Sequence, residues 1–320
     1  MILLWGCAGE GPFQAVADAL DRLGGEYFLF DQRDTPDASI LVRGGRRVSG
    51  WLRTPSGAIS LEEVTGVFLR PHDIRRLPAY QLEQSAGSLQ QAMQLEQLLF
   101  EWIEVTPALV INKPSAMASN NCKPYQSRLI ERCGLRVPRT LITTSPADAE
   151  AFWRQHQRVV YKSISGIRSI VSQLTDAHRH RLSELRHCPT QLQEYIDGDD
   201  YRVHVVGEHV SCCKICCGGD DYRYAHRDGV DSEMTPCAIP GEVAQQCRAV
   251  TRALGLTLSG IDLRRRSDGS WYCFEVNPSP GFTCFDEATA AHIAEATAQA
   301  LMAGSTHQNV APERATRPHS

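Results

Sequence analysis

Residues 260–281 read GIDLRRRSDGSWYCFEVNPSPG, and this stretch predicts a β-hairpin. Two runs with strand-like alternation flank the Asp-Gly pair at 268–269, which is typical of a two-residue type I′ turn. With that turn, counting outward places Asp262 directly opposite Glu275, and Asn277 lies two residues farther along the same face. The hairpin then has a polar face and an apolar face. The apolar face, which we expect to pack on a core, carries Ile261, Leu263, Phe274 and Val276.

The facing carboxylates need a counter-charge, because like charges directly opposite one another destabilise a sheet. Two carboxylates and an amide are oxygen ligands that suit Mg²⁺, which keeps water and phosphate oxygens in its other positions. One interpretation is therefore a metal site formed by Asp262, Glu275 and Asn277. In the other interpretation, Arg264 and Arg266 neutralise the two acids in a solvated surface network.

The composition is that of a globular protein with a small-molecule or peptide partner. At 320 residues the chain is long enough for two or three compact units. Its 33 basic and 37 acidic residues nearly cancel, which argues against nucleic-acid binding and against a membrane-surface protein. No run approaches the roughly 18 apolar residues of a membrane helix, and the opening residues show no basic leader. We therefore expect a cytoplasmic protein whose 12 cysteines stay reduced.

Strand and helix patterns divide the chain into an N-terminal part and a longer remainder. Residues 1–112 begin with a strand, a helix and a second strand, the order of an α/β unit. A long amphipathic helix is expected over about residues 85–105, and the strand and loop that follow it mark a domain boundary. Residues 304–320 are polar and lack periodic apolar positions, so we expect a disordered tail.

Six fragments after residue 112 occur in the order in which one known family has them: NCKPYQSRLI, VVYKSISG, QLQEYIDG, DYRVHVVG, SGIDL and FEVNPSPG. This part of the sequence resembles an ATP-grasp enzyme of the RimK and glutathione-synthetase type. The resemblance implies an α/β (α+β) fold in which two lobes with antiparallel sheets grip ATP. The central lobe would cover residues 113–190 and the C-terminal lobe residues 191–303, and a smaller α/β domain over residues 1–112 would precede them.

The same resemblance assigns roles to individual residues. Asp262, Glu275 and Asn277 become ligands of Mg²⁺ or Mn²⁺, and Arg202 and Lys214 become catalytic cations beside the transferred phosphoryl group. ATP would be bound by two phosphate lysines, a loop over the phosphates, an interdomain hinge and an acid near the ribose. These are Lys123 and Lys162; Ser165, Gly166 and Arg168; Gln193, Glu194, Tyr195 and Ile196; and Asp200. The hinge would contact the adenine edge through main-chain groups, and the phosphate loop departs from the family's glycine-rich pattern with its single glycine.

Residues 212–217 read CCKICC, which raises the question of a metal or redox site. Alternation along a strand places Cys212, Lys214 and Cys216 on one face and the two other cysteines on the opposite face. Four sulfurs on two faces cannot converge on one ion, and the run lacks the turn that pairs cysteines in a structural zinc site. We therefore expect small buried side chains beside a functional Lys214.

The resemblance implies a ligase that depends on ATP and Mg²⁺. A substrate carboxylate would attack the γ-phosphate of ATP to give an acyl phosphate and ADP, and an amine would then displace phosphate to form an amide. Two alternatives stay open: a nucleotide-binding regulatory module without turnover, and a kinase that stops at phosphorylation. The expected partners are ATP, a carboxylate substrate and an amine substrate, without nucleic acid or membrane, and a homo-oligomer also stays open.

The substrate is either a peptide or a small amino-acid-like acid. Several fragments, together with a second DYR at residues 221–223, resemble the graspetide type of ligase, which modifies ribosomal peptides. Arg70 has two open roles, one with a substrate carboxylate and the other in a surface ion pair. The scattered histidines lack a clear partner that would mark a general base; they are His72, His204 and His226.

Overall fold

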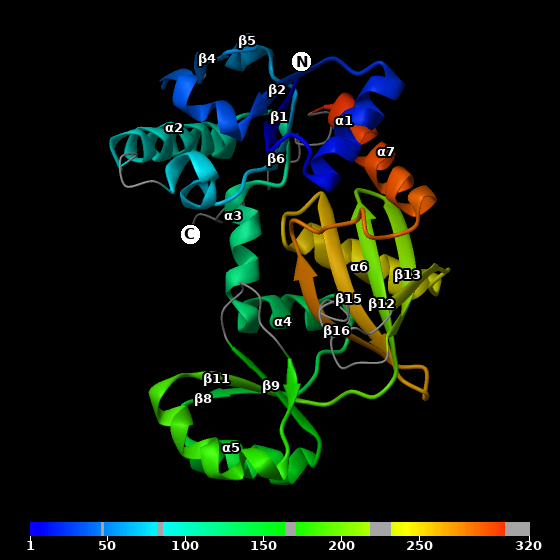
Figure 1. The fold of residues 1–320 in the computed structure, drawn as a ribbon. Helices are drawn as coiled ribbons and strands as arrows, with labels where there is room; N and C mark the ends of the chain where they lie inside the picture. Colours follow the sequence, from blue (N-terminus) through cyan, green and yellow to red (C-terminus); the bar gives the residue numbers. More distant parts are fainter. Residues whose placement is uncertain (46–47, 82–85, 164–170, 218–231, 305–320) are drawn as a thin grey trace, which may run out of the picture. The chain divides into compact units, whose positions relative to one another are not determined.

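The chain divides into two compact units (Figure 1). One is formed by Met1–Pro114 together with the segment from Ala294 onward, and the other by Ser115–Ile293. Within the part of the chain that is described, no helix has the length and apolar character that crossing a membrane requires. This computed structural model describes residues 1–45, 48–81, 86–163, 171–217 and 232–304.

The first unit is built on a parallel sheet. Its elements are β1 (Ile2–Gly6), α1 (Gly11–Leu23), β2 (Tyr27–Asp31), β6 (Gly66–Arg70), α2 (Ala86–Val105) and β7 (Leu109–Ile111). The strand order is β2-β1-β6-β7, and all neighbours are parallel. Helix α1 begins where the Glu10 carboxylate accepts the Phe13 N–H at 2.8 Å, and it ends at Gly24, whose φ of 70° only glycine adopts readily. The expected strand, helix and strand at the start are confirmed.

Smaller elements complete this unit. A three-stranded antiparallel sheet is formed by β3 (Ser39–Arg43), β4 (Ser49–Thr54) and β5 (Gly57–Ser60). The short 3-10 helices are η1 (Gln32–Asp37), η2 (Leu61–Glu63), η3 (Ile74–Arg76) and η4 (Pro78–Tyr80). Helix α7 (Glu287–Ala303) begins in the second unit, and its residues from Ala294 onward belong to the first.

The second unit contains two antiparallel sheets. The smaller sheet has the order β10-β9-β11-β8 and is formed by β8 (Thr140–Thr143), β9 (Val159–Ser163), β10 (Ser172–Gln173) and β11 (Thr190–Glu194). The larger sheet has the order β14-β13-β12-β15-β16 and is formed by β12 (Asp199–Val206), β13 (His209–Cys217), β14 (Ser232–Pro236), β15 (Leu258–Arg265) and β16 (Trp271–Asn277). The helices of this unit are α3 (Pro114–Met117), η6 (Ala118–Asn121), α4 (Lys123–Arg132), α5 (Pro146–His156), η7 (Asp176–His187) and α6 (Gly241–Ala253). The expected mixed fold with antiparallel sheets is confirmed.

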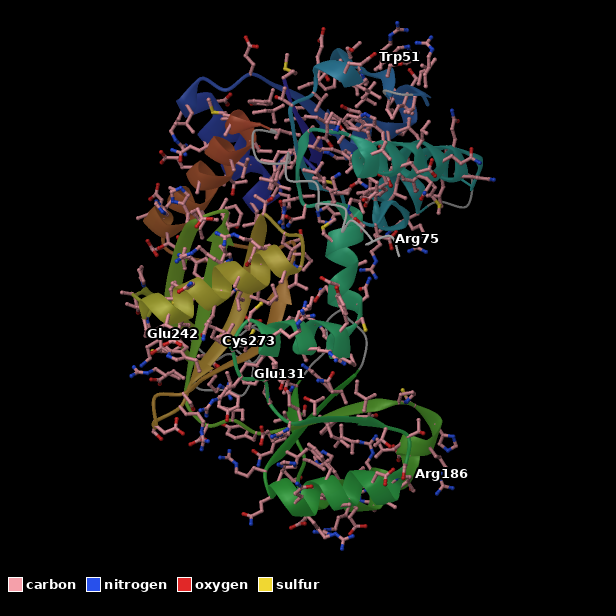
Figure 2. The ribbon with its side chains drawn as sticks, turned by 180° about the vertical axis from the view of Figure 1, so that it is seen from behind. Trp51, Arg75, Glu131, Arg186, Glu242 and Cys273 are labelled. Atoms are coloured by element: carbon pink, nitrogen blue, oxygen red, sulfur yellow. The ribbon has the colours of Figure 1, made fainter. Side chains whose placement is uncertain are left out.

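One face of the larger sheet is a packed core. Helix α6 lies over β12 and β15 (Figure 1), and Val250 of the helix is fully buried against Val203 and Ile261 of the strands. Cys273 of β16, labelled in Figure 2, belongs to the same core and is 1% exposed. Burial of these apolar side chains fixes which face of each strand looks away from the helices. The polar residues of β12, β15 and β16 are therefore directed to the opposite face.

A buried carboxyl interrupts the apolar face of α2 in the first unit. Glu96 is 7% exposed, and its Oε1 accepts a hydrogen bond from Gln32 Nε2 at 2.6 Å. Gln32 is fully buried and also bonds the main chain of His72 in both directions, at 2.8 Å each. Burial raises the pKa of Glu96 to about 7, because the charged form loses its hydration. This unit therefore contains a carboxyl that becomes charged near neutral pH.

We expect Glu96→Gln to leave stability unchanged at about pH 5 and to increase it at about pH 8. The pKa of Glu96 in the folded protein lies above the ordinary value of 4.5, so folding loses stability as the pH rises from there through about 7. The glutamine keeps an oxygen that accepts from Gln32 and it cannot ionise. Urea denaturation at both pH values measures the effect, with Glu101→Gln on the exposed face of α2 as the control. Equal effects at the two pH values would contradict a buried titrating carboxyl.

Candidate active site

The hairpin β15–β16 has the predicted pairing at its polar end but a different turn. Asp262 is the register partner of Glu275, and Gly260 is that of Asn277, as the sequence predicts. The predicted two-residue turn is wrong. The Arg266 N–H donates to the Ser270 carbonyl at 2.9 Å, so the loop has three residues and Gly269 takes a φ of 84° within it.

A β-bulge at Phe274 restores the predicted register. From the turn to the pair Leu263 and Cys273, each strand partner differs by one residue from the predicted partner. An irregularity in the pairing between Asp262 and Leu263 then cancels this shift. Cys273 therefore takes the core position that the sequence assigned to Phe274, and that assignment is wrong. A bulge redirects the side chain at its site, and here the Phe274 ring lies 5.2 Å from the Arg264 guanidinium on the polar face.

Each acid of the pair has a cation from a different element. Arg202 Nη1 donates to Asp262 Oδ1 at 2.6 Å, and the two residues are cross-strand partners in β12 and β15. Lys123 Nζ, at the first residue of α4, donates to Glu275 Oε1 at 2.5 Å. The side chains are largely buried, with exposures of 9 and 17% in the first pair and 13 and 19% in the second. Gly260 makes room for this arrangement, because a Cβ there would overlap the Arg202 guanidinium.

The donor atoms on this face fit Mg²⁺. Asp262, Glu275 and Asn277 bring two carboxylates and an amide to neighbouring positions of one face, and such hard oxygen donors are the ligands that Mg²⁺ prefers. The Ser279 N–H donates to Asn277 Oδ1 at 2.9 Å, which orients the amide. The described ranges contain no group of three or more His, Cys, Asp or Glu residues that could hold a metal ion. A metal on this hairpin would therefore need the amide or the oxygens of a ligand besides the two acids.

Arg264 ties the predicted hinge to β15. Its guanidinium makes two hydrogen bonds to the Asp200 carboxylate, at 2.6 and 2.8 Å, and a third to the Ile196 carbonyl at 2.7 Å. The Tyr195 ring contacts two guanidinium groups, that of Arg158 at 3.7 Å and that of Arg264 at 5.7 Å. The hinge is thus held by arginines, a feature that the sequence did not indicate.

Some main-chain groups of the hinge form hydrogen bonds within the protein. The Glu194 N–H donates to the Arg139 carbonyl at 2.9 Å, and the Glu194 carboxylate accepts from the Arg139 N–H at 2.7 Å. The side chain of Gln193 donates to Thr140 Oγ1 at 3.0 Å. Because the Ile196 carbonyl already binds Arg264, the Glu194 carbonyl and the Ile196 N–H are the main-chain groups to consider for a base edge.

Lys162 lies on the face of the smaller sheet that looks away from its helices. Its register partner Gln191 is 3% exposed, and the Gln191 Oε1 has no hydrogen-bond partner within the described residues. The alternate positions of the same strands, including Val159 and Leu192, pack with Trp153 of α5. A buried amide oxygen without a donor is costly, and beside a lysine it marks a position that a ligand could satisfy. No pattern in the sequence marks Gln191.

The register of β13 separates Lys214 from the acid pair. Lys214 is the partner of Tyr201, whereas Cys213 is the partner of Arg202. Lys214 therefore lies on the face of Tyr201, which belongs to the core beneath α6, and it bonds Asp199 Oδ2 at 2.8 Å. The structure brings Arg202 to the acids and places Lys214 on the other side of the sheet.

Burial accounts for Cys212 and Cys213 of the cysteine-rich strand, whereas Cys216 is exposed, so the expectation of buried side chains is wrong for Cys216. Cys212 is 7% exposed in the core, and Cys213, 1% exposed, lies on the opposite face, so the predicted alternation is confirmed. Burial raises the pKa of both thiols, that of Cys213 to about 11, so they stay protonated at neutral pH. Cys212 Sγ lies 3.6 Å from Cys237 Sγ, at the point where β13 and β14 meet. These thiols behave as small packed side chains.

Two further residues singled out in the sequence have partners of their own. The Arg70 guanidinium bonds both oxygens of Glu10, at 2.9 and 2.7 Å, so an ion pair is the role that the structure shows. His204 is 2% exposed, and burial lowers its pKa to about 3, so the ring is neutral. Its Nε2 lies 3.3 Å from the Gly281 carbonyl.

Some predicted residues lie outside the part of the chain that is described. They are the phosphate-loop residues Ser165, Gly166 and Arg168, the second DYR (Asp221, Tyr222 and Arg223), His226, and the tail from residue 305.

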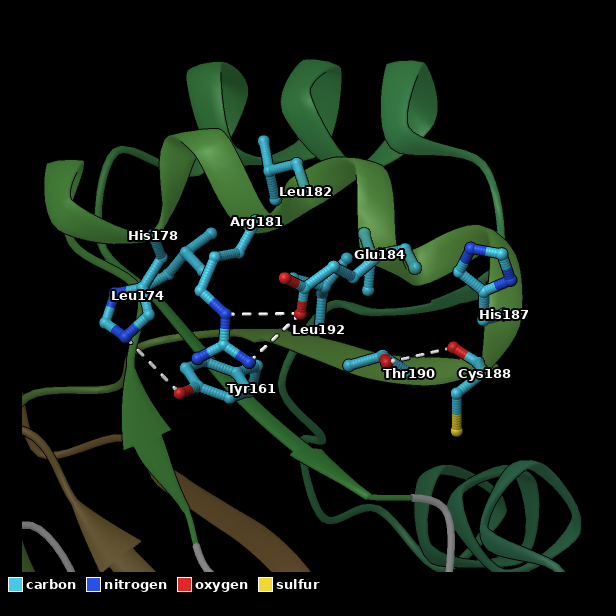
Figure 3. A pocket seen from close by; sticks show the side chains of 11 residues that line it. Tyr161, Leu174, His178, Arg181, Leu182, Glu184, His187, Cys188, Thr190 and Leu192 are labelled. Atoms are coloured by element: carbon cyan, nitrogen blue, oxygen red, sulfur yellow. Dashed lines mark hydrogen bonds and ion pairs between the residues drawn. The ribbon is translucent and has the colours of Figure 1, made fainter.

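A separate pocket of about 490 Å³ lies on the smaller sheet (Figure 3). Figure 3 shows an ion pair between Arg181 and Glu184, 3.0 Å long, at its polar side, and a contact of 3.4 Å between the Tyr161 hydroxyl and His178. The apolar part of the lining is formed by Tyr161, Leu174, Leu182, Leu185 and Leu192. Tyr161 precedes Lys162 in β9 and points to the other face, so the pocket and the lysine lie on opposite sides of one sheet.

Two solved structures that share this fold are ATP-grasp ligases. A RiPP-associated ATP-grasp ligase of Chryseobacterium gregarium, in complex with ADP and a leader and core peptide, has a TM-score of 0.81 at 21% identity and covers 94% of this chain and 96% of that chain. The ATP-grasp ligase PsnB, complexed with minimal precursor, Mg and ADP, has a TM-score of 0.74 at 25% identity, over 95% and 98% of the two chains.

The model of the RimK-like ATP-grasp domain matches residues 118–301, and this chain belongs to that family. The resemblance inferred from the sequence is therefore confirmed. A relative named as a probable alpha-L-glutamate ligase, from Alkalilimnicola ehrlichii, is 30% identical over 203 residues, which are 60% of this chain and 66% of the relative. The match thus spans just under two thirds of that relative's length.

We expect Arg264→Lys to lower the free energy of unfolding by about 2 kcal/mol, because lysine keeps the charge and loses the two-point contact with Asp200 and the bond to Ile196. The matched control is Arg266→Lys, whose pair with Asp197 is more open, with side-chain exposures of 37 and 55%. Exposed pairs contribute little, so the control should lose less than about 0.5 kcal/mol. Urea denaturation measures both, and equal losses would contradict the role of Arg264 in holding the hinge.

Proposed function

We propose that this protein is a ligase that uses ATP and Mg²⁺ to join a carboxylate to an amine through an acyl phosphate. The observation that carries the proposal is the pair Asp262 and Glu275, cross-strand partners with a separate cation on each. Arg202 and Lys123 neutralise the two acids, and a bound Mg²⁺ would add the positive charge that two carboxylates on one face can hold. Membership of the RimK-like ATP-grasp family supports the nucleotide.

ATP would be bound by residues of both sheets and of α4. Lys123 and Lys162 would bind phosphate oxygens, since a compact ammonium group suits them. The Glu194 carbonyl and the Ile196 N–H would bind the adenine edge, because the Glu194 N–H, the Tyr195 N–H and the Ile196 carbonyl have protein partners. Phe274, which the bulge turns to the face of Arg264, would give the base an apolar surface.

Asp262, Glu275 and Asn277 would hold Mg²⁺. When bound, the ion neutralises charge that develops on the phosphate oxygens. Arg202 and Lys123 already lie beside the two acids, so additional positive charge is available on the same face. Asp200 would act through Arg264, which it holds with two hydrogen bonds.

The reaction would proceed in two balanced steps. First, a substrate carboxylate oxygen bonds the γ-phosphorus while the bond from this phosphorus to the β–γ bridging oxygen breaks, which gives an acyl phosphate and ADP. Second, the amine nitrogen bonds the acyl carbon, phosphate leaves, and the nitrogen loses a proton to solvent. Arg202 and Lys162 would stabilise the transferred group, and Ser165, Gly166 and Arg168 remain the residues predicted to cover it. Lys214 is left out, because the register places it on the other face.

Two other functions would use the same nucleotide site. A regulatory module would bind ATP without turnover, and a kinase would stop after phosphoryl transfer. Release of ADP, measured with and without an added amine, separates the three. The module releases none, the kinase releases ADP regardless of amine, and the ligase requires the amine for continued release.

We expect Glu275→Gln to reduce Mg²⁺-dependent ADP formation by at least about 100-fold, the scale on which the loss of one electrostatic contact to developing charge is felt. The glutamine can still accept the hydrogen bond from Lys123, so circular dichroism and the unfolding midpoint should stay near those of the wild type. Glu208→Gln is the control, because this carboxylate is 73% exposed on the surface. Retained Mg²⁺-dependent turnover in Glu275→Gln would defeat the assignment.

For the substrate, we propose a peptide rather than a small acid. Two solved structures of the same fold hold peptides, described as a leader and core peptide and as a minimal precursor. The pocket of the smaller sheet has an apolar lining of a size that accommodates side chains of a peptide, and it lies on the face opposite Lys162. A peptide is long enough to fill this pocket and also to reach the face of Lys162, whereas a free amino acid is too short for that. If the gene has a short neighbouring reading frame, its product is the first peptide to test.

We expect Leu185→Gln to raise the KM for such a peptide about 10-fold and to leave kcat within about twofold. Leu185 lines the pocket and is half-buried, so a polar group there weakens an apolar contact far from the reacting atoms. Met93→Gln, on the outer face of α2 and 44% exposed, is the matched control. Steady-state kinetics with saturating ATP give both constants. A KM that is the same in both variants would remove the pocket from the account.

A further inference from the structure

Gln126 is a buried amide that bonds one residue of the acidic hairpin in both directions. Its Nε2 donates to the Val276 carbonyl at 2.8 Å, and its Oε1 accepts the Val276 N–H at 3.0 Å. The side chain is 1% exposed, in helix α4, one turn after Lys123. A buried amide side chain whose donor and acceptor are both satisfied by the main chain of one residue is rigidly placed.

The position of Val276 gives this contact its importance. Among the described residues strand β16 is the last strand of its sheet, so its outer edge has no strand partner beyond the isolated bridge between Arg136 and Tyr272. Gln126 bonds that edge as a strand would, and the Arg136 carbonyl does the same for the Cys273 N–H at 2.7 Å. A strand edge leaves main-chain N–H and C=O groups without partners, and Gln126 satisfies those of Val276 near the end of β16.

Val276 lies between Glu275 and Asn277, two of the three residues that would hold Mg²⁺. We propose that Gln126 is a positioning residue for this metal site, which rests on the proposed function. Fixing the peptide units on either side of Val276 fixes the main chain from which both ligands project. Mg²⁺ requires nearly ideal octahedral geometry at about 2.1 Å, so small displacements of its ligands weaken binding.

Helix α4 then holds the hairpin at two points. Gln126 holds the main chain, and Lys123, three residues earlier on the same face of the helix, holds the Glu275 side chain. A phosphate-binding lysine and two metal ligands are thereby kept in one rigid group. Gln126 itself contacts neither nucleotide nor metal, so its effect passes through the strand.

The chain contains a matched control for the loss of such a contact. Gln32, fully buried in the first unit, bonds the N–H and carbonyl of His72 in the same two-way manner. Gln126→Met and Gln32→Met each remove a buried two-way amide with little change of volume. Both variants should lose stability, and the Gln126 variant alone should lose metal affinity.

The experiment titrates Mn²⁺ into each protein in the presence of ADP and follows free Mn²⁺ by electron paramagnetic resonance. We expect Gln126→Met to weaken Mn²⁺ binding by about 10-fold, the scale seen when groups that orient metal ligands are removed, and Gln32→Met to change it by less than about twofold. ADP binding without metal should be unaffected in both. Equal weakening in the two variants, or none in Gln126→Met, would overturn the role of Gln126.

A second variant answers the question if Gln126→Met does not fold. In Gln126→Glu, a protonated carboxyl both donates and accepts, as the amide does, whereas the ionised form cannot donate to the Val276 carbonyl. The ratio of the Mn²⁺ affinity of this variant to that of the wild type should therefore be close to one at about pH 5.5. It should be about 10-fold lower at about pH 8. A ratio that does not change with pH would overturn the proposal. Absence of Mn²⁺ binding by the wild type with ADP would instead overturn the metal site itself.

Discussion

Two negative charges held opposite one another on a sheet impose the constraint on which the second unit depends. Asp262 and Glu275 are fixed by backbone pairing, so they cannot move apart without breaking the hairpin. The protein meets this constraint with Arg202 from the adjacent strand and Lys123 from a helix. A buried ion pair stabilises little by itself, because desolvation offsets most of the attraction. The charges of this arrangement match the chemistry of the proposed metal–phosphate complex.

The constraint also explains why α4 lies where it does. The helix contributes little apolar surface for its length, with Ile130 as its fully buried aliphatic residue, and it bonds β16 through Gln126 and Lys123. Its position is therefore set by polar contacts that require correct geometry, whereas α6 on the same core is set by apolar packing. Polar contacts of this kind define the position of a helix, although each adds little to the free energy of folding.

The sequence predicted the face-to-face acids for a reason that was partly wrong. The Asp-Gly pair indicated a two-residue turn, and the actual three-residue loop shifts the register by one until the bulge at Phe274 shifts it back. A bulge has no reliable signal in one sequence, since it depends on how the strand fits its core and its neighbours. The resemblance implied the catalytic role of Lys214, and alternation alone does not say which face of the sheet a helix will cover.

Elements with strong local patterns were predictable, and long-range polar contacts were not. The start of the first unit follows from apolar periodicity and a glycine that ends the helix, and both can be read over a few residues. Glu96 lies within such a pattern, but its burial depends on Gln32, 64 residues away in the chain. The partners of Gln126 and Arg264 lie 150 and 64 residues away, so no local rule connects them. The site is therefore assembled from residues whose type the sequence shows and whose pairing only the fold provides.

The cysteine-rich strand shows how the two faces of the larger sheet differ in chemistry. Cys212 lies on the face of α6, where burial also raises the pKa of Cys247 to about 12, so that face holds neutral thiols as packing groups. On the opposite face, Cys213 is the neighbour of Arg202, and its raised pKa keeps it neutral beside a cation. A thiolate there would compete with Asp262 for the guanidinium, and a neutral thiol does not. The small, uncharged side chain of Cys213 therefore allows the Arg202 guanidinium to pair with Asp262. The cysteine supports this ion pair by remaining neutral.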